Sequence, residues 1–403
     1  MTHRFEHDTC ITGLGQSAIG RRLGRSALDL TTEACLAAVE DAGLDRADID
    51  GLVTYPGGEA ALSHGYGGPP PAAAADALRL ELNWYEGAAE LPGQLGAVVA
   101  ACLAVSSGLA RHVLVYRTVT ESSAQGAAGR AQVLPGAGGV PAAGVNYWTA
   151  PFGAVSAVNW LAQVAARHFH VYGTTREQLG ALAVTQRANA ALNPAAPLRV
   201  PFDLAEYLAA RMISTPLCLL DCDLPVDGST ALVVSPADRA AAAPRPPVFV
   251  EAVGTALRGR ASWDQYGDLA SMAADGAAAH LWRRTGLRPA DVDLAQLYDG
   301  FSILALVWLE ALGFCGRGEG GGFIGDGARI TRTGELPVNT AGGQLSGGRL
   351  HGYGHLHEAC LQLRGGAGAR QVLRRRGDAP KVAVVSNGGG PVAGCLLLTS
   401  SRI

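Results

Sequence analysis

The 403-residue sequence contains a single lysine, Lys381, among 32 lysine and arginine residues. A mechanism that forms a Schiff base with a lysine would therefore have to use this residue. Lys381 precedes the apolar stretch 382–386, where a solvent-exposed residue at the entry of a strand is the expected interpretation. The sequence therefore argues against Schiff-base chemistry.

Charged residues are few as well, at 17% of the chain against 48% hydrophobic residues. The formal net charge is −3 and the longest basic run is three arginines, at 374–376, so we expect no nucleic-acid partner. No stretch reaches the roughly 18 apolar residues that span a bilayer, and the first ten residues lack an apolar signal region. We therefore expect a cytoplasmic protein with no membrane partner, which covers part of its apolar surface in an oligomer.

Clusters with metal-ligand spacing are also lacking. Of eight scattered cysteines only Cys218 and Cys222 lie close together, without the second pair that a zinc site requires. His351, His355 and His357 are near one another in sequence, but the last two would face different sides of a helix. We therefore expect no metal site and no tightly bound cofactor.

What the sequence does contain is an alternation of apolar helices and strands. Residues 26–44 carry a helical apolar stripe with Ser26 as N-cap, and 94–109 predict a buried helix between the strands 51–54 and 112–116. Residues 154–168 predict another helix, and Thr174 to Glu177 fit a capping box that opens the next. This alternation predicts an α/β fold. Residues 126–144, rich in glycine, alanine and proline, are expected to form a loop over a site or a partner surface.

Two segments of the chain repeat each other without gaps. Residues 42–55 and 285–298 are identical at six of fourteen positions, and each ends a helix, turns and enters a strand that closes on a tyrosine, Tyr55 or Tyr298. An alanine- and proline-rich joint, 237–247, separates the two copies. We therefore expect an N-terminal half, residues 1–240, with a loop or cap region at about 117–215, and a C-terminal half, residues 241–403.

Candidate functional groups follow two expected strands of the second half. Tyr298 and Asp299 run from a strand end to a helix start, where α/β proteins collect reactive groups, and alternation points one of them to the cleft. The strand 382–386 leads into Gly388, Gly389 and Gly390, whose N–H groups could hold an oxyanion. A tight turn explains a glycine triplet equally well.

A glycine-dense segment, 339–354, lies between these two strands. It leaves Arg349, His351 and Tyr353 as its few large polar side chains, and its glycines would allow close backbone approach to a ligand. Packing of Tyr353 in the core, with its hydroxyl on a carbonyl group, is the alternative interpretation.

Together these features resemble the thiolase superfamily over nearly the whole chain. The segments 211–218, 297–301 and 348–354 resemble its lipid-transfer-protein group, related to the thiolase of sterol carrier protein x, in the branch of steroid side-chain-cleaving aldolases. The resemblance implies two duplicated β-α-β-α-β-α-β-β halves in five layers, α-β-α-β-α. It also implies an acyl-CoA substrate, with CoA as part of that substrate, a homodimer, and a zinc-containing OB-fold partner in a heterotetramer.

The catalytic groups of true thiolases are missing where the resemblance places them. Tyr298 replaces a histidine of the thioester site, Arg349 replaces the histidine that activates the nucleophile, and Ser386 replaces the second cysteine. Residues 90–94, where the nucleophilic cysteine would open the buried helix, contain no cysteine. An acyl-enzyme is therefore not expected.

The resemblance then implies a carbon–carbon lyase that cleaves a β-hydroxyacyl-CoA side chain, expected to be that of a steroid, by a retro-aldol reaction to a ketone and a short acyl-CoA. Tyr298 and Tyr353 are expected as the acid/base pair, in an order that the sequence leaves open. Amides of Gly388 to Gly390 are candidate donors to the thioester enolate.

Three further side chains are expected to support this pair. A basic tyrosine needs a nearby cation that favours phenolate, such as Arg349 or a protonated histidine, and His351 and Asp299 are the other two supporting residues. Two alternatives stay open: an acyltransferase of the thiolase kind, and a non-catalytic lipid-binding or scaffold subunit in which both tyrosines are core residues.

Overall fold

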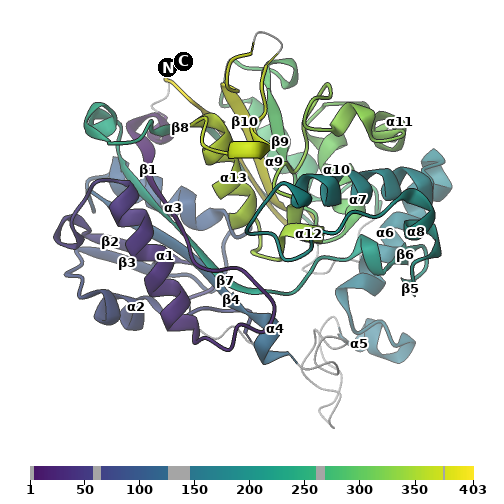
Figure 1. Cartoon of the computed structure of the whole chain (residues 1–403), viewed down its shortest axis with the longest axis horizontal. Coiled ribbons are helices and arrows are strands. Elements are labelled where there is room, and N and C mark those ends of the chain that lie inside the picture. Colours follow the sequence, from purple (N-terminus) through teal and green to yellow (C-terminus); the bar gives the residue numbers. More distant parts are fainter. Residues whose placement is uncertain (1–3, 58–64, 126–145, 260–267, 375–376) are drawn as a thin grey trace.

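The computed structural model describes the chain except for residues 1–3, 58–64, 126–145, 260–267 and 375–376. Its strands form one nine-stranded sheet, ordered β3-β2-β4-β7-β1-β8-β11-β10-β9, and a two-stranded ribbon, β5-β6. The large sheet is two half-sheets, because β1 and β8 join through only two residue pairs, Cys10 with Phe249 and Ile11 with Val248. Figure 1 shows the N-terminal half-sheet beside the C-terminal one.

The first half-sheet and its helices come from the N-terminal part of the chain. These elements are β1 (Thr9–Gln16), α1 (Ala27–Asp41), β2 (Gly51–Thr54), α2 (Pro71–Leu78), β3 (Trp84–Gly87), α3 (Gly96–Ser106), β4 (Val113–Thr120) and β7 (Asp227–Pro236). Before β7 the chain forms a cap with α4 (Glu121–Ala124), α5 (Asn146–Thr149), α6 (Ala157–Tyr172), α7 (Arg176–Ala191), α8 (Leu204–Ala209), β5 (Met212–Ser214) and β6 (Leu217–Cys218).

The second half repeats this order of elements. They are β8 (Val248–Leu257), α9 (Ala273–Trp282), β9 (Leu294–Gln296), α10 (Ser302–Ala311), α11 (Gly320–Ile324), α12 (Gly343–Gly347), α13 (Tyr353–Leu363), β10 (Val382–Gly388) and β11 (Val392–Thr399). The strand expected between α10 and α13 is reduced to one parallel bridge of Val338 with Ala295 on β9.

Helices α3 and α13 form the middle layer of the molecule. Both contribute to one buried cluster that also contains residues of each half-sheet, for example Cys102 and Leu356 with Val115 and Val385. Helices α1 and α2 cover the outer face of the first half-sheet, and α9 and α10 with α6 and α7 cover that of the second (Figure 1). The predicted α/β fold with duplicated halves in five layers is therefore confirmed.

The duplication extends to individual hydrogen bonds. In the first copy the N–H of Asp45 donates to Oδ2 of Asp48 at 2.8 Å, around the 3-10 turn Arg46–Asp48. In the second copy the N–H of Arg288 donates to Oδ2 of Asp291 at 2.8 Å, around Pro289–Asp291. The same side chain thus closes the same turn before β2 and before β9.

A second pair of aspartates ties neighbouring strands together. Asp50 accepts hydrogen bonds from the N–H groups of Arg111 and His112 at 2.8 and 2.9 Å, at the entry of β4. Asp293 accepts from the N–H groups of Lys381 and Val382 at 2.7 and 3.0 Å, at the entry of β10. Equivalent carboxylates therefore fix the register of equivalent parallel strands in the two halves.

One predicted helix cap is confirmed and another is wrong by one residue. Ser26 caps α1, and its Oγ accepts from the N–H of Asp29 at 3.0 Å. Helix α7 is capped by Thr175 with Gln178, because this sequence fits the capping pattern in either register. The hydroxyl of Thr174 instead bonds Nδ1 of His168 at 2.8 Å, which fixes the later register.

Three further expectations concern a loop, the boundary between the two halves and membrane-spanning segments. Residues 126–144, expected to cover a site or a partner surface, lie outside the described residues. The boundary expected at 240–241 falls in the 3-10 segment Ala237–Ala242, between β7 and β8. Within the described ranges, no helix is long and apolar enough to cross a membrane.

Removing either strand-register aspartate should destabilise the fold. Asp50→Ala and Asp293→Ala each leave two backbone N–H groups without their acceptor, and we expect a loss of about 1–3 kcal/mol in the free energy of unfolding. Urea denaturation followed by circular dichroism measures this loss. The exposed Asp76 of α2 makes a control, because Asp76→Ala should change stability by no more than about 0.5 kcal/mol. Equal effects in all three variants would contradict the prediction.

Candidate active site

The two candidate tyrosines lie at the ends of elements that meet near the middle layer. Tyr298 follows β9, is 8% exposed, and its N–H donates to Oγ of Ser386 at 2.9 Å. Tyr353 opens α13 and is fully buried, and its hydroxyl donates to the carbonyl oxygen of Gln94, just before α3, at 3.3 Å. Tyr353 is therefore packed in the core with its hydroxyl on a carbonyl group. This is the alternative interpretation that the sequence left open.

A buried asparagine holds the starts of the two central helices together. Oδ1 of Asn387 accepts from the N–H of Gln94 at 2.6 Å, and its Nδ2 donates to the carbonyl oxygen of His351 at 2.8 Å. Gly93 and Gly352 have φ of +70° and +88°, and a Cβ on either would lie 2.6 or 2.5 Å from the Asn387 side chain. Only glycine therefore fits beside this amide.

Next to Tyr353 the side chains form a compact cluster that sequence reasoning missed. Nε2 of Gln94 donates to the hydroxyl of Tyr66 at 3.0 Å. The guanidinium of Arg117 lies 4.7 Å from the centre of the Tyr66 ring, and the His351 ring meets that ring edge-on at 4.6 Å. Arg117 is the one charged residue of strand β4, and this was the available signal for it.

A charged network lies on the other side of His351. Arg349 donates through Nε and Nη2 to both oxygens of Glu121 at 2.8 and 3.0 Å, and through Nη1 to Asp223 at 3.1 Å. Nε2 of His351 lies 3.2 Å from the same Glu121. The guanidinium expected to favour phenolate is therefore already shared between two carboxylates.

Burial and these pairs shift the ionisation of the network. Burial would raise the pKa of Glu121, but Arg349 and His351 outweigh it and lower that pKa to about 2. Burial raises the pKa of Asp223 to about 7, with Glu121 acting in the same direction and Arg349 against it. Burial also lowers the pKa of His351 to about 4. His351 is thus neutral at pH 7.

Both tyrosine hydroxyls have raised pKa values, but for different reasons. Burial raises the pKa of Tyr298, and the charge of Asp223 raises it further, while Arg349 opposes both. Burial alone raises the pKa of Tyr353, and Arg117 opposes it. An arginine therefore opposes the effect of burial on the pKa of each tyrosine, and the Asp223 carboxyl group adds to that effect at Tyr298.

Asp299 supports the site through the backbone. Its oxygens accept from the N–H of Gln344 at 2.9 and 3.0 Å, at the start of α12, and Oδ1 lies 3.0 Å from Nε2 of His355. The side-chain amide of Gln344 has no hydrogen-bond partner among the described residues, yet it lies close enough to Tyr298 to lower the pKa of that hydroxyl. Asp299 thereby positions the segment beside Tyr298.

The glycine triplet forms the turn between β10 and β11. The N–H of Gly389 donates to the carbonyl oxygen of Val392 at 3.1 Å, so it is not free to bind an oxyanion, and this corrects the expectation for that residue. The carbonyl oxygen of Gly388 accepts from Nε1 of Trp308 at 3.1 Å. The carbonyl oxygen of Gly390 accepts from the N–H of Ala273 at 2.9 Å. These hydrogen bonds are those of a tight turn between two strands. Binding of an oxyanion by Gly388 and Gly390 stays a prediction.

Neither thiols nor clustered ligands add a further reactive centre. Cys102 lies within α3, where burial raises the pKa of its thiol to about 12. His351 and His355 have separate partners, Glu121 and Asp299. Over the residues that the structure describes, no group of three or more histidine, cysteine or acidic side chains could hold a metal ion.

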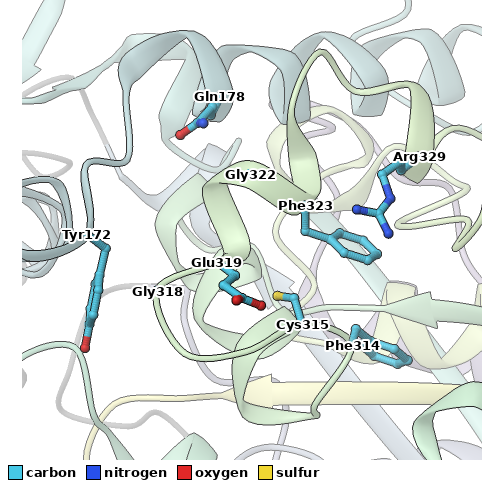
Figure 2. Close-up of a pocket in the computed structure, with 9 residues that line it drawn as sticks. All are labelled: Tyr172, Gln178, Phe314, Cys315, Gly318, Glu319, Gly322, Phe323 and Arg329. Atoms are coloured by element: carbon cyan, nitrogen blue, oxygen red, sulfur yellow. The ribbon is translucent and has the colours of Figure 1, made fainter.

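An open cavity of about 500 Å³ is lined by residues other than Tyr298 and Tyr353 (Figure 2). The residues around it come from the end of α6, the start of α7 and the segments flanking α11, and they are Tyr172, Gln178, Phe314, Cys315, Gly318, Glu319, Gly322, Phe323 and Arg329. Because none of the candidate residues lines it, we place the chemistry at the tyrosines instead.

The shifted groups predict how stability depends on pH. His351 has a folded pKa of about 4 against an ordinary 6.5, so the unfolded chain takes up a proton in this interval that the folded chain does not, and acidification from pH 6.5 to 4 costs stability. Asp223, with a folded pKa of about 7 against 3.8, acts in the opposite sense over the same interval.

Two variants separate these opposing contributions. On acidification from pH 6.5 to 4, His351→Gln should lose less stability than the wild type, by up to about 3 kcal/mol. Asp223→Asn should lose more, because it lacks the opposing group. Denaturant titrations at each pH measure both, and identical pH dependence in wild type and variants would show that the two groups do not titrate as inferred.

Comparison with known proteins identifies the family. The profile of the thiolase C-terminal domain-like family matches residues 255–396. A steroid side-chain-cleaving aldolase of Thermomonospora curvata is 36% identical over 96% of this chain and 97% of that protein. A 17-hydroxy-3-oxo-4-pregnene-20-carboxyl-CoA lyase of Mycobacterium tuberculosis is 36% identical over 88% of this chain and 91% of that protein.

More distant similarity reaches the acyltransferases of the same fold. An acetyl-CoA acetyltransferase of Methanothermobacter thermautotrophicus is 32% identical over 95% of this chain and 96% of that protein. Among solved structures, the Ltp2-ChsH2(DUF35) aldolase superposes with a TM-score of 0.84 at 33% identity and covers 98% of both chains. The chain therefore belongs to the steroid side-chain-cleaving aldolases, carbon–carbon lyases of the thiolase superfamily, as its motifs predicted.

Proposed function

We propose that this protein cleaves the side chain of a steroid β-hydroxyacyl-CoA by a retro-aldol reaction, to a ketone and a short acyl-CoA. The observation that carries the proposal is that Tyr298 after β9 and Tyr353 at the start of α13 are both buried, and that Ser386 beside Tyr298 stands where a thiolase cysteine is expected. The similarity to a steroid side-chain-cleaving aldolase and to a pregnene-carboxyl-CoA lyase supports the steroid and CoA parts of the substrate.

This site lacks the cysteines that would form an acyl-enzyme. Ser386 stands where the second thiolase cysteine is expected, and its Oγ accepts a hydrogen bond from the N–H of Tyr298. The nearest cysteine to the start of α3 is Cys102, whose thiol is buried and has a raised pKa. A Schiff base is disfavoured too, because Lys381 is exposed at the end of β10 opposite to Gly388.

The remaining groups suit a reaction in which the thioester is the electron sink. One tyrosine accepts the proton of the β-hydroxyl, the oxygen electrons form the ketone, and the bond between the α- and β-carbons breaks. The electron pair of that bond forms the thioester enolate, and the second tyrosine donates a proton to the α-carbon. The protein contributes a buried setting in which hydrogen bonds to the enolate are strong.

The chain is further proposed to work as a homodimer with a second protein. Strand β3 ends the sheet, so one of its edges is open for pairing, and its Tyr85 is 64% exposed. The solved aldolase that this chain is similar to carries two components in its name, Ltp2 and ChsH2(DUF35). We propose an OB-fold protein that contains zinc as the partner, in a heterotetramer. Light scattering should give the mass of two chains alone and a larger mass with the partner, whereas a monomer in both cases would contradict this.

Acyl transfer is the second candidate, since an acetyltransferase is among the relatives. It requires a nucleophile that the site lacks, so we rank it below cleavage. A lipid-binding or scaffold role is the third, and it would leave both tyrosines as core residues.

Substitution of either tyrosine should abolish cleavage. We expect Tyr298→Phe and Tyr353→Phe to lower turnover of a steroid β-hydroxyacyl-CoA by about 10²–10⁴-fold, because each removes one proton-transfer group. Ketone and short acyl-CoA are followed by chromatography, with and without the partner protein.

A matched control removes a buried hydroxyl elsewhere. Tyr116 of β4 is fully buried and its hydroxyl donates to the carbonyl oxygen of Pro69 at 2.7 Å, so Tyr116→Phe should retain turnover while losing a comparable hydrogen bond. Turnover that survives in both site variants would support a scaffold role. Acyl transfer to free CoA, with no ketone formed, would return the protein to the acyltransferases.

A further inference from the structure

Two glutamine side chains near Asp299 are buried without hydrogen-bond partners. Gln186 of α7 has no exposed surface, and Gln344 of α12 is 1% exposed. The Nε2 and Oε1 atoms of both side chains lack a partner among the residues that the structure describes. A Cβ on Gly343, the residue before Gln344, would meet both the Asp299 carboxylate and Oε1 of Gln186. An unpaired buried amide destabilises the folded state, so these side chains are not explained by stability.

The main chain of Gln344 is held from two sides. Its N–H donates to both carboxylate oxygens of Asp299, at 2.9 and 3.0 Å, and its carbonyl oxygen accepts from the N–H of Leu224 at 3.1 Å. Gly343 has φ of +58°, which leaves no room for a side chain beside Asp299. The backbone therefore fixes the direction of the Gln344 side chain and leaves the amide at its end unpaired.

The amide of Gln344 adjoins a candidate tyrosine. Burial raises the pKa of Tyr298 and the charge of Asp223 raises it further, whereas the Gln344 amide lowers it. An amide has this effect when its N–H group is near the phenol oxygen, because an N–H group stabilises negative charge. The Nε2 end of Gln344 therefore faces the reacting groups. Since Tyr298 is 8% exposed, a substrate that contacts its hydroxyl also comes within reach of Nε2.

Other side-chain donors around the two tyrosines are already engaged. Nε2 of Gln94 donates to a phenol oxygen at 3.0 Å, and Nδ2 of Asn387 donates to a backbone carbonyl at 2.8 Å. The three donor nitrogens of Arg349 are bonded to carboxylates. Arg117 has two unpaired nitrogens within the described ranges, but an aromatic ring packs against its guanidinium at 4.7 Å. Gln344 is therefore the unpaired amide donor beside a candidate tyrosine.

The proposed cleavage needs a donor to the thioester oxygen. As the bond between the α- and β-carbons breaks, its electron pair moves into the thioester, and negative charge develops on that oxygen. The N–H of Gly389, which was expected in this role, is bonded to Val392 in the turn. A neutral N–H group without another partner suits an oxygen that becomes anionic only during the reaction, because their hydrogen bond is strongest in the transition state.

We propose that Gln344 is an oxyanion donor of the cleavage, and that its Nε2 donates a hydrogen bond to the thioester oxygen on which the enolate charge forms. This inference rests on the proposed function. Gln344 keeps its protons throughout: the hydrogen bond strengthens as the enolate forms and weakens when protonation of the α-carbon restores the thioester carbonyl. Because no proton passes through the amide, Gln344 acts in the same way for either order of the two tyrosines.

Gln344→Met tests the inference, because it removes the amide and keeps an unbranched side chain of similar length. Loss of an oxyanion donor should lower kcat of cleavage about 10²–10³-fold. KM should change much less, because the hydrogen bond acts mainly in the transition state. The midpoint of urea denaturation should stay equal to that of the wild type or rise, since the side chain loses no hydrogen bond to the described part of the chain.

Gln362 of α13 offers a matched control. It is fully buried like Gln344, but its Nε2 donates to Thr340, Glu358 and the carbonyl oxygen of Arg370. Gln362→Met should therefore lower the midpoint of urea denaturation, while the folded protein keeps its turnover. A lowered midpoint in Gln344→Met together with an unchanged kcat would show that Gln344 is a structural residue, and would overturn the inference.

Infrared spectroscopy tests the contact without turnover. An acyl-CoA without the β-hydroxyl group cannot undergo retro-aldol cleavage, so its isotope-labelled thioester carbonyl can be observed while bound. A hydrogen bond weakens the C=O bond, and the band should lie at lower wavenumber on the wild type than in water, and move back on Gln344→Met. A band on the wild type at or above its position in water would overturn the inference, even if Gln344→Met does not fold.

Cleavage by the wild type separates this inference from the proposed function. If the wild type releases no ketone from a steroid β-hydroxyacyl-CoA, the proposed function itself is refuted. If it does release ketone, and Gln344→Met retains kcat with an unshifted carbonyl band, the proposed function stands and the role of Gln344 is refuted.

Discussion

The side-chain amide of Asn387 is the interaction on which the site depends. It stands at the end of β10 and bonds the backbone at the starts of both central helices, Gln94 before α3 and His351 before α13. Each helix comes from a different half of the chain, so one buried amide sets the distance between residues that the duplication alone would leave unrelated. Because its two partners are backbone groups on glycine-flanked turns, small shifts of Asn387 would move Tyr353 and Gln94 together.

The two halves of the chain contribute different side chains to the region around Asn387. The first half contributes Arg117, whose Nε and Nη2 have no hydrogen-bond partner among the described residues, and the second contributes both tyrosines of the proposed pair. The cap and α4 contribute the carboxylates of Glu121 and Asp223, which hold Arg349. Arg117 opposes the effect of burial on the pKa of Tyr353, whereas Asp223 adds to that effect on the pKa of Tyr298. No metal ion or covalent intermediate is needed in this scheme.

Much of the fold could be predicted from the sequence because the relevant signals are local. The repeat of 42–55 in 285–298 reflects turns closed by Asp48 and Asp291, whose partners lie three residues away. The site was harder. Glu121 lies 228 residues before Arg349 and Asp223 lies 126 residues before it, so no local pattern showed that Arg349 was already paired. Tyr66 and Gln94 likewise acquire meaning only when the fold brings them to Tyr353.

The scarcity of lysine also has a practical consequence. Lys381 carries the only side-chain amine of the chain, and it is exposed at the entry of β10, with its backbone held by Asp293. Apart from the α-amino group of the chain, an amine-reactive fluorophore or surface tether would therefore attach at one known side chain, at the other end of the strand from Asn387. Orientation on a sensor surface, or a distance to a labelled partner, could then be measured without introducing a new residue.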